Sequence, residues 1–522
     1  LLDFYNYRAS AIAEGRREDV RSFVIARQTD QAAANKLAGL LVRQGVEVGR
    51  STEAFSACGR DYAAGSFVIR TDQPAKRFIR TLLDVNVPME EAFLAEQERR
   101  RARNLPDEIY DVTGWSLPLM MNVETDSCSR VPSAELTKVG PELVQAGAVQ
   151  GGQAAVSYLV PWGQAPAVRL LSQALRSGMA VKSNDKAFVH AGVEYPAGTL
   201  IIDVADNAVN AAEEAELFAT LESLAAATGA NVVGLNDSWV TAGPSFGSAN
   251  VVRHNAIKVA MAWDEPTSAY SAGNTRFIIE RQFDFPVTAI RTSMLRRANL
   301  SRYQVLILPV GRGSAYKSAL GEEGVARLRD WIDAGGVLIS LGSATQLLAD
   351  PDVDLLAIRR EEAVVEVEIE EEETDGATVA GSYITSDSEY RDAIVSVTGA
   401  PDSVAGVLVR AEADQEHWLT AGIAPELHVL ARGSDIYTPI RFDNGSNVVR
   451  FKGPDELVAS GYLWEENKRQ LAYKPAVVSQ AVGAGQVIGF TQDPTVRAYL
   501  DGLNVLLMNA IFRGAAHARP VR

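Results

Sequence analysis

The sequence predicts an α/β protein in which two related α/β repeat units are followed by a doubly wound domain with a β-rich insertion. Two observations support this fold class. Short apolar segments of strand length alternate with helical patterns along most of the chain, which is typical of sheets covered by helices. The same residue types also recur at a constant separation of 133 positions, which indicates an internal duplication.

The duplication defines two repeat units, which we expect to span residues 19–135 and 136–252. Each begins with a strand and a helix, followed by a hairpin that leads into a buried strand. The recurring pairs are Gly45 and Gly178, Phe55 and Phe188, Tyr62 and Tyr195, Gly65 and Gly198, and Ile69 and Ile202. Residues 1–18 predict a helix of their own, interpreted as the trailing helix of a missing upstream domain.

Length and charge limit the classes of partner. At 522 residues the chain is long enough for several domains, each with its own core. Its net charge of −16 disfavours nucleic acid and anionic membrane surfaces, because both attract basic proteins. No apolar run reaches the roughly 18 residues that a membrane span requires. We therefore expect no nucleic-acid partner and no membrane span.

Two local features of the first unit concern its surface and its redox state. The basic segment 99–103 is expected to form a solvated helix face, as runs of like charge usually do. Cys58 and Cys128 are the only cysteines and could form one disulfide. Two cysteines do not imply an oxidising compartment, so two unpaired thiols are the favoured interpretation.

The third domain is expected to span residues 253–522, with a β-rich insertion at about 355–480. Strands are predicted at 257–263, 287–290, 303–311 and 337–341. Helical patterns lie between them, so the sheet should be parallel and doubly wound. The acidic run 361–373 holds eight glutamates, and its alternating part, Val365–Glu370, predicts an exposed or edge strand with helix as the alternative.

Two kinds of catalytic motif are incomplete. None of the five histidines begins the His-x-x-Glu pattern of a zinc carboxypeptidase site, so no metal site is predicted. The segment 311–318 resembles the end of a phosphate-binding loop, but Tyr316 stands where the glycine before the lysine is needed. We interpret it as an ordinary strand-to-helix loop.

The strand–turn–helix stretch 335–349 resembles the nucleophile elbow of class I glutamine amidotransferases, a flavodoxin-like fold. Gln346 and the apolar residues after it match the end of the family's Gly-x-Cys-x-Gly-x-Gln motif. Segment 489–495 aligns with the family's Gly-x-Gln-x-His-Pro-Glu signature. The resemblance places Gly342, Asp493 and Thr495 at the positions of the catalytic cysteine, histidine and glutamate. A thiol and an imidazole are what activate such a nucleophile, so we predict no catalytic residue at these degenerate positions.

A wider resemblance covers essentially the whole chain. Its blocks are similar to those of large bacterial zinc carboxypeptidase-like proteins: 110–118 (YDVTGWSLP), 195–199 (YPAGT), 461–467 (GYLWEEN), 493–497 (DPTVR) and 509–510 (NA). In that family a metallocarboxypeptidase domain precedes an amidotransferase-like region. The resemblance implies a secreted or periplasmic parent that removes C-terminal residues from peptides, with its zinc in the upstream domain. This chain would be the part that follows the peptidase domain and needs no cofactor of its own.

Whether the chain is itself an enzyme stays open at this point. The leading hypothesis is an accessory region that packs against the peptidase domain or binds peptide or glycan. The alternatives are an independent hydrolase or amidotransferase-like enzyme with an unrecognised site, and a purely structural spacer. Candidate ligand contacts lie where strands of the parallel sheet end: Trp263, Asp264, Tyr270, Gln346, Asp493 and Arg497. The alternative role of Trp263 is core or rim packing, and that of Tyr270 and Gln346 is local packing or helix hydrogen bonding. For Asp493 and Arg497 it is capping or an ion pair at the last helix.

Overall fold

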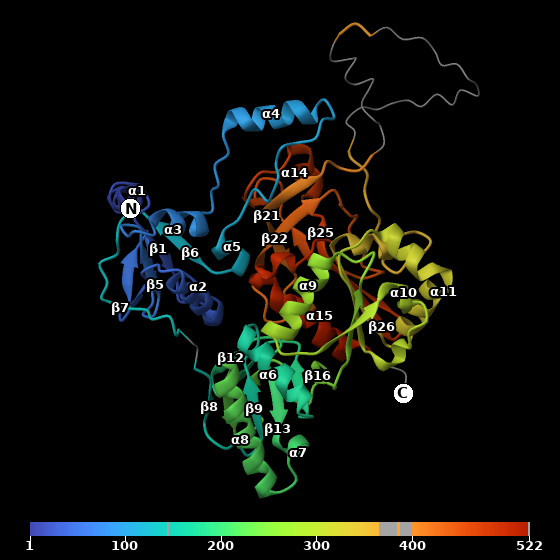
Figure 1. Cartoon of the computed structure of the whole chain (residues 1–522). Helices are drawn as coiled ribbons and strands as arrows, with labels where there is room; N and C mark the ends of the chain where they lie inside the picture. Colours follow the sequence, from blue (N-terminus) through green and yellow to red (C-terminus); the bar gives the residue numbers. More distant parts are fainter. Residues whose placement is uncertain (144–145, 365–383, 387–398, 520–522) are drawn as a thin grey trace, which may run out of the picture.

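The computed structural model describes the chain except residues 144–145, 365–383, 387–398 and 520–522 (Figure 1). It is a mixed α/β protein with several separate sheets. The predicted strand Val365–Glu370 lies outside the described residues. The elements of the N-terminal part are α1 (Leu2–Gly15), β1 (Ser22–Ile25), α2 (Gln31–Arg43), β2 (Gly49–Ser51), β3 (Phe55–Ala57), β4 (Arg60–Tyr62), β5 (Phe67–Arg70), α3 (Lys76–Leu83), α4 (Glu91–Arg101), α5 (Leu117–Met121), β6 (Thr125–Cys128) and β7 (Leu136–Lys138).

The middle part forms a second sheet with its own helices. Its elements are β8 (Ala148–Gln150), β9 (Ser157–Val160), α6 (Ala165–Arg176), β10 (Val181–Asn184), β11 (Phe188–His190), β12 (Val193–Tyr195), β13 (Leu200–Asp203), α7 (Val204–Asn207), α8 (Ala211–Thr228), β14 (Asn231–Leu235), β15 (Val240–Ala242) and β16 (Val251–His254). We call these two parts the first unit and the second unit. The remainder, from β17 onward, is the C-terminal domain.

The C-terminal domain is built on the largest sheet. Its elements are β17 (Val259–Trp263), α9 (Ala269–Phe277), η1 (Ile278–Gln282), β18 (Val287–Arg291), α10 (Thr292–Leu295), η2 (Leu300–Arg302), β19 (Val305–Leu308), α11 (Gly313–Asp333), β20 (Val337–Leu341), η3 (Gly342–Ala344), α12 (Thr345–Ala349), β21 (Val404–Ala413), η4 (Trp418–Thr420), β22 (Glu426–Gly433), β23 (Ser446–Phe451), β24 (Val458–Ser460), α14 (Glu465–Leu471), β25 (Pro475–Val482), β26 (Gly485–Phe490), η5 (Val496–Ala498), η6 (Asp501–Leu503) and α15 (Asn504–His517).

The first unit is organised around an antiparallel sheet in the order β6-β1-β5-β2-β7. α2 begins after Asp30, whose carboxylate accepts a hydrogen bond from the N–H of Ala33 (2.9 Å). Burial of this cap raises the pKa of Asp30 to about 6. The apolar face of α2, including Leu37, shares one buried cluster with Phe23 and Phe67 of the sheet. The cap and the helical spacing of apolar residues thus account for how α2 covers the sheet.

The second unit repeats the strand pairing of the first. Its sheet has the order β16-β10-β13-β9-β14-β8. β13 pairs antiparallel with β9 and β10, just as β5 pairs antiparallel with β1 and β2. Each unit also carries a hairpin with a stacked aromatic pair, Phe55 on Tyr62 (5.1 Å between ring centroids) and Phe188 on Tyr195 (5.3 Å).

The sheet of the C-terminal domain is parallel at one side and antiparallel at the other. Its order is β18-β17-β19-β20-β26-β25-β23-β21-β22, and the first five strands are parallel. Alternate residues of the parallel strands enter two different cores. Met261 and Ile307 pack with α9 and α15, and Leu306 and Leu338 pack with α11 and α12. Both faces are therefore covered, which explains why every residue of β19 and β20 is buried and why Ser340 is the one polar residue in the two strands.

α4 and the chain after it lie across the C-terminal domain, next to α14 (Figure 1). Arg101 forms ion pairs with Asp402 (2.8 Å) and Glu466 (2.9 Å) and lies over the ring of Trp464. Tyr462 donates a hydrogen bond to Glu98 (2.5 Å). The prediction of a solvated helix face is therefore wrong at Arg101, because tertiary packing supplies carboxylates and an aromatic ring to that side of the helix.

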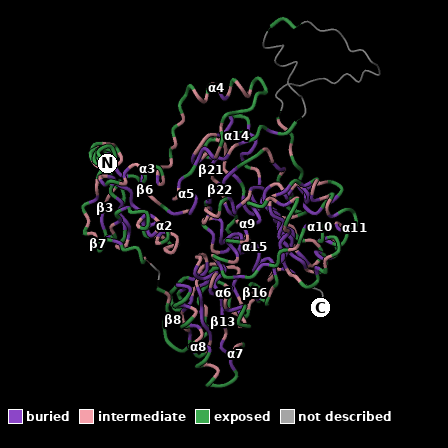
Figure 2. The backbone as a smooth tube through the Cα atoms, viewed as in Figure 1, coloured by how far each residue is buried: buried purple, intermediate pink, exposed green. Residues whose placement is uncertain are grey.

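α15 of the C-terminal domain and α4 differ in how far their residues are buried (Figure 2). α15 is buried along most of its length, from Asn504 to Gly514, whereas Gln97 is the one buried residue of α4. α15 thus belongs to the core, and α4 is a surface strap between the first unit and the C-terminal domain.

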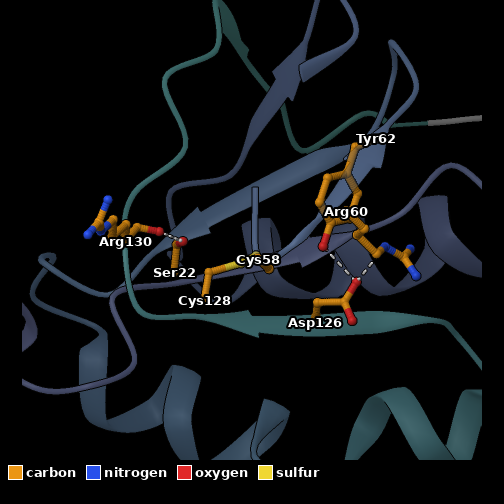
Figure 3. The surroundings of a disulfide bond; sticks show 7 residues. All are labelled: Ser22, Cys58, Arg60, Tyr62, Asp126, Cys128 and Arg130. Carbon is orange, nitrogen blue, oxygen red and sulfur yellow. Dashed lines mark hydrogen bonds and ion pairs between the residues drawn. A yellow bond between two sulfur atoms is a disulfide. The ribbon is translucent and has the colours of Figure 1, made fainter. Parts of the chain in front are cut away.

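Cys58 and Cys128 form a disulfide (Figure 3). Cys58 lies in the turn between β3 and β4, Cys128 ends β6, and their Cα atoms are 5.1 Å apart. The expectation of two unpaired thiols is therefore wrong. The β3–β4 hairpin folds over the sheet and meets its edge strand, which the sequence separation of 70 residues does not reveal.

Candidate functional site

Gly342 and Asp493, the positions that the sequence resemblance aligns with the amidotransferase nucleophile and base, lie next to each other. Gly342 follows β20 with a φ of +54°, a conformation that favours glycine. A Cβ placed on Gly342 would lie 3.6 Å from the Cβ of Asp493 and 3.0 Å from Cγ2 of Val310. The carboxyl ends of β20 and β26 bring the two positions together because these strands are parallel neighbours.

The carboxylate of Asp493 is occupied by local hydrogen bonds. Its Oδ1 accepts from the N–H of Thr495 (2.8 Å) and from the Thr495 hydroxyl (2.6 Å). The Thr495 Oγ1 also lies 3.0 Å from Oγ1 of Thr275 in α9, and both threonines are buried. The structure thus brings the predicted degenerate positions 342, 493 and 495 close together. The hydrogen bonds between Thr495 and Asp493 and between Thr495 and Thr275 connect the segment after β26 to α9.

Gln346 connects three segments of the same sheet edge. Its Nε2 donates to both carboxylate oxygens of Asp435 (2.9 and 2.8 Å), and its Oε1 accepts from the N–H of Gly313 (3.1 Å). Asp435 is also paired with Nε of Arg360 (2.7 Å). The side chain of Gln346 therefore has protein partners at both ends of its amide.

The candidates at the end of β17 are more exposed. The Trp263 ring lies under the guanidinium of Arg276 (5.6 Å) and packs against the core. Asp264 has a φ of +71°, and its carboxylate is 3.9 Å from Nε of Arg291. Tyr270 is 86% exposed. Trp263 is thus a packing residue, and Tyr270 has its ring in solvent.

Arg497 contacts Asp111, in the chain between α4 and α5. Its guanidinium pairs with Asp111 (2.6 Å) and holds the pKa of that carboxyl below its usual range. The φ of Arg497 is +52°. The ion-pair alternative stated for this residue describes its position in the structure.

Ser343, next to the elbow, has no histidine partner among the residues that the structure describes. Ser343 Oγ donates to the carbonyl of Gly311 (3.3 Å), and none of the five histidines hydrogen bonds to it in the described chain. Over the described ranges, no three His, Cys, Asp or Glu side chains are grouped as a metal site requires. None of the helices that the structure describes combines the length and hydropathy of a membrane span.

An open cleft of about 960 Å³ lies beside the disulfide. Its lining combines charges of both signs, Asp19, Asp61, Arg60 and Arg130, with serine hydroxyls. Arg60 is already paired with Asp126 (3.2 Å), as Figure 3 shows. This mixture of groups does not select one class of ligand.

Sequence reasoning missed a group of buried polar residues on α15. Asn509 and Arg513 are both 0% exposed, although the helix around them is apolar. The available signal was their spacing of four residues, which places them on one side of a helix. Their partners, Trp162 and Asp185, lie in the second unit, more than 300 positions away.

No protein-family model matches the sequence, and no curated protein matches it significantly. Among solved structures, a ThuA-like protein from Parabacteroides merdae is 14% identical, with a TM-score of 0.34 over 51% of this chain and 92% of its own. A glutamine amidotransferase from Thermotoga maritima is 10% identical, with a TM-score of 0.29 over 50% and 99%. A β-galactosidase from Bacillus circulans sp. alkalophilus is 13% identical, with a TM-score of 0.30 over 52% of this chain and 32% of the enzyme.

The structures similar to this chain therefore include glutamine amidotransferase-like folds. Likeness of this size says nothing about activity. The carboxypeptidase-like parent stays a prediction.

Proposed function

We propose that the chain is a non-catalytic accessory region of a zinc metallocarboxypeptidase-like protein. It packs against the peptidase domain of that protein and binds peptide or glycan at the amidotransferase-like sheet edge. The parent protein removes C-terminal residues from peptides, and its zinc lies in the peptidase domain. The sequence blocks quoted above support the parent, and the chemistry of the degenerate site supports the non-catalytic role.

The single observation that carries the non-catalytic role is the state of the three catalytic positions. Position 342 has no side chain, and the carboxylate of Asp493 is held by Thr495. The chain's two cysteines are bonded to each other, so it has no thiol to serve as a nucleophile. Acyl transfer through a cysteine therefore cannot occur there.

The family-like blocks contact one another, which supports a packing role. The Thr113 N–H donates to the carbonyl of Gly406 (2.7 Å), and the Thr113 hydroxyl accepts from the N–H of Tyr462 (2.8 Å). A side chain at Gly114 would clash with the carbonyl oxygen of Ser460. The backbones of blocks 110–118 and 461–467 are therefore in direct contact. A side chain larger than hydrogen at Gly114 would push the first unit away from the C-terminal domain.

Two further features support the proposed partner and location. α1 exposes apolar side chains on its first turns: Leu2 is 70%, Phe4 60% and Tyr5 68% exposed. A group of exposed large apolar residues is typical of a surface that packs against another domain. The disulfide supports a secreted or periplasmic protein, because such bonds persist in oxidising compartments.

We also propose that the two N-terminal units are copies of one ancestral unit. The matching strand pairings and the two aromatic stacks support this. Gly45 and Gly178 add a further correspondence, since both end a helix with φ near +80° (+81° and +84°).

The non-catalytic role is tested on the full chain with acyl and amide substrates and with a thermal-shift panel of peptides and glycans. We expect no turnover and a rise in melting temperature with a ligand class that Asp493→Ala abolishes. Asp443→Ala is the matched control, because Asp443 is an exposed aspartate on another loop. Turnover lost in Asp493→Ala would support an independent hydrolase, and a panel without any stabilising ligand would support a spacer.

The parent is tested by reading the coding sequence upstream of Leu1. A domain with His-x-x-Glu and a distant histidine is expected there. Its absence would overturn the peptidase part of the proposal and leave the non-catalytic role untouched.

A further inference from the structure

One side of α15 carries polar residues that contact the second unit. Asn509, Arg513 and His517 follow at intervals of four, so they lie along one side of the helix. Trp162 Nε1 donates to Asn509 Oδ1 (3.0 Å), and Arg513 Nη1 donates to the hydroxyl of Ser183 (2.9 Å). These hydrogen bonds cross from the C-terminal domain to the second unit.

A single carboxylate balances the positive charge at this contact. The Arg513 guanidinium is 0% exposed and pairs with Asp185, while its Nε donates to the carbonyl of Trp418 (2.9 Å). Nε2 of His517 lies 3.2 Å from the same Asp185 oxygen. Any further positive charge that forms here lacks a second buried carboxylate, which makes it costly.

His254 and Arg513 both contact the hydroxyl of Ser183. His254 is 4% exposed, and its Nε2 lies 2.8 Å from Oγ of Ser183. Since this oxygen already accepts a hydrogen bond from Arg513, its own proton is free to be donated to a neutral imidazole. Protonating Nε2 would turn that acceptor into a donor and place a second cation beside Arg513.

His417 also accepts a hydrogen bond, but from its own segment of the C-terminal domain. Its Nδ1 accepts the N–H of Leu419 (3.1 Å), which requires Nδ1 to carry no proton. The neighbouring Trp418 ring stacks on His517, with 4.4 Å between centroids. Three of the chain's five histidines therefore meet at this contact, and two of them are held as hydrogen-bond acceptors.

The electrostatic surroundings agree with this geometry. Burial, with Arg513 close by, lowers the pKa of His254 to about 3, and burial lowers the pKa of His417 to about 4. The titratable and charged groups that face the contact from all elements are Asp185, Lys186, His254, Asp414, Glu416, His417, Arg513 and His517. Lys186 is paired with Glu416 at the rim.

We propose that this contact is an acid-sensitive latch. At neutral pH it holds the second unit on the C-terminal domain, and proton uptake by His254 and His417 releases the second unit. Each histidine that regains an ordinary pKa near 6.5 on opening favours the open form about a hundredfold at pH 4.5. The latch is independent of the proposed accessory function, because it follows from contacts within this chain.

Hydrogen exchange of the full chain between pH 7.5 and 4.5 tests the latch. Exchange of peptides from α15 and β16 is divided by that of β19 and β20 peptides in the same sample, so the intrinsic pH dependence cancels. We expect this ratio to rise steeply as the pH falls, and His254→Gln or His417→Gln to reduce the rise by up to about a hundredfold. His190→Gln is the control, because His190 is a buried histidine on β11 of the second unit whose Nε2 contacts Asp237, outside the latch.

A ratio that stays constant down to pH 4.5 would overturn the proposal. So would a rise in the ratio that both latch variants share with the wild type. If neither variant folds, the pH dependence of the wild-type ratio alone tests the proposal. Global unfolding would raise exchange in β19 and β20 as well and would therefore leave the ratio unchanged.

Discussion

The disulfide of the first unit offers the sharpest test of the fold. Removing it, by reduction or by Cys58→Ala with Cys128→Ala, frees a loop of 70 residues in the unfolded chain. The loop-closure relation gives a loss of about 4 kcal/mol in the free energy of unfolding for a loop of this length. The effect should be local, because Cys128 ends β6, and among the described strands β6 pairs only with β1.

Some contacts across the same junction should survive reduction. Asp126 on β6 accepts from the Tyr62 hydroxyl (2.8 Å) and pairs with Arg60 (3.2 Å), so the β3–β4 hairpin keeps polar contacts with β6 in the folded state. The stability change should therefore arise mainly in the unfolded chain. Urea titrations read by hydrogen exchange of β1 and β5 measure it, since a chain of several domains has no single unfolding free energy.

The double alanine variant provides the control, because a reductant should leave its stability unchanged. β19 and β20 peptides of the C-terminal domain should keep their wild-type midpoints in every sample. A loss of less than about 1 kcal/mol in the free energy of unfolding of the first unit would refute the reasoning, because the loop-closure relation would then not describe this disulfide.

Three further predictions concern other parts of the chain. Gly342→Ala should cost about 1–3 kcal/mol in urea unfolding of the C-terminal domain, because φ is +54° and Val310 is 3.0 Å from the new Cβ; an unchanged midpoint would contradict this. Asn509→Leu should cost about 3 kcal/mol or more in the same assay, because it leaves the Trp162 N–H and two carbonyls unpaired. Burial lowers the pKa of His428 to about 4, so the unfolded chain binds its proton first as the pH falls; stability should drop by about 3 kcal/mol between pH 6.5 and 4, and His428→Gln should remove that part of the slope.

The sequence predicts which residues stand at the three aligned positions of the elbow, and the degenerate site itself stays a prediction. Gly342, Asp493 and Thr495 carry neither a thiol nor an imidazole, so these three residues cannot form a thiol–imidazole pair in any fold. The strand–turn–helix pattern also located the elbow, since β20, η3 and α12 follow in that order. The sequence could not predict that Thr495 occupies the carboxylate of Asp493, or that Gln346 is held by Asp435. Those partners depend on side-chain positions rather than on periodicity.

Local patterns in the sequence by themselves determined the mixed α/β class and the strand–turn–helix order of the elbow. Such signals depend on spacing within about one element, where the periods of helix and strand act directly. Only the tertiary structure decided the disulfide, the packing of Arg101 of α4 against Asp402 and α14, and the burial of Arg513. Each joins residues between 70 and more than 300 positions apart. Contacts at that distance are set by how whole sheets and helices pack, and no local period records them.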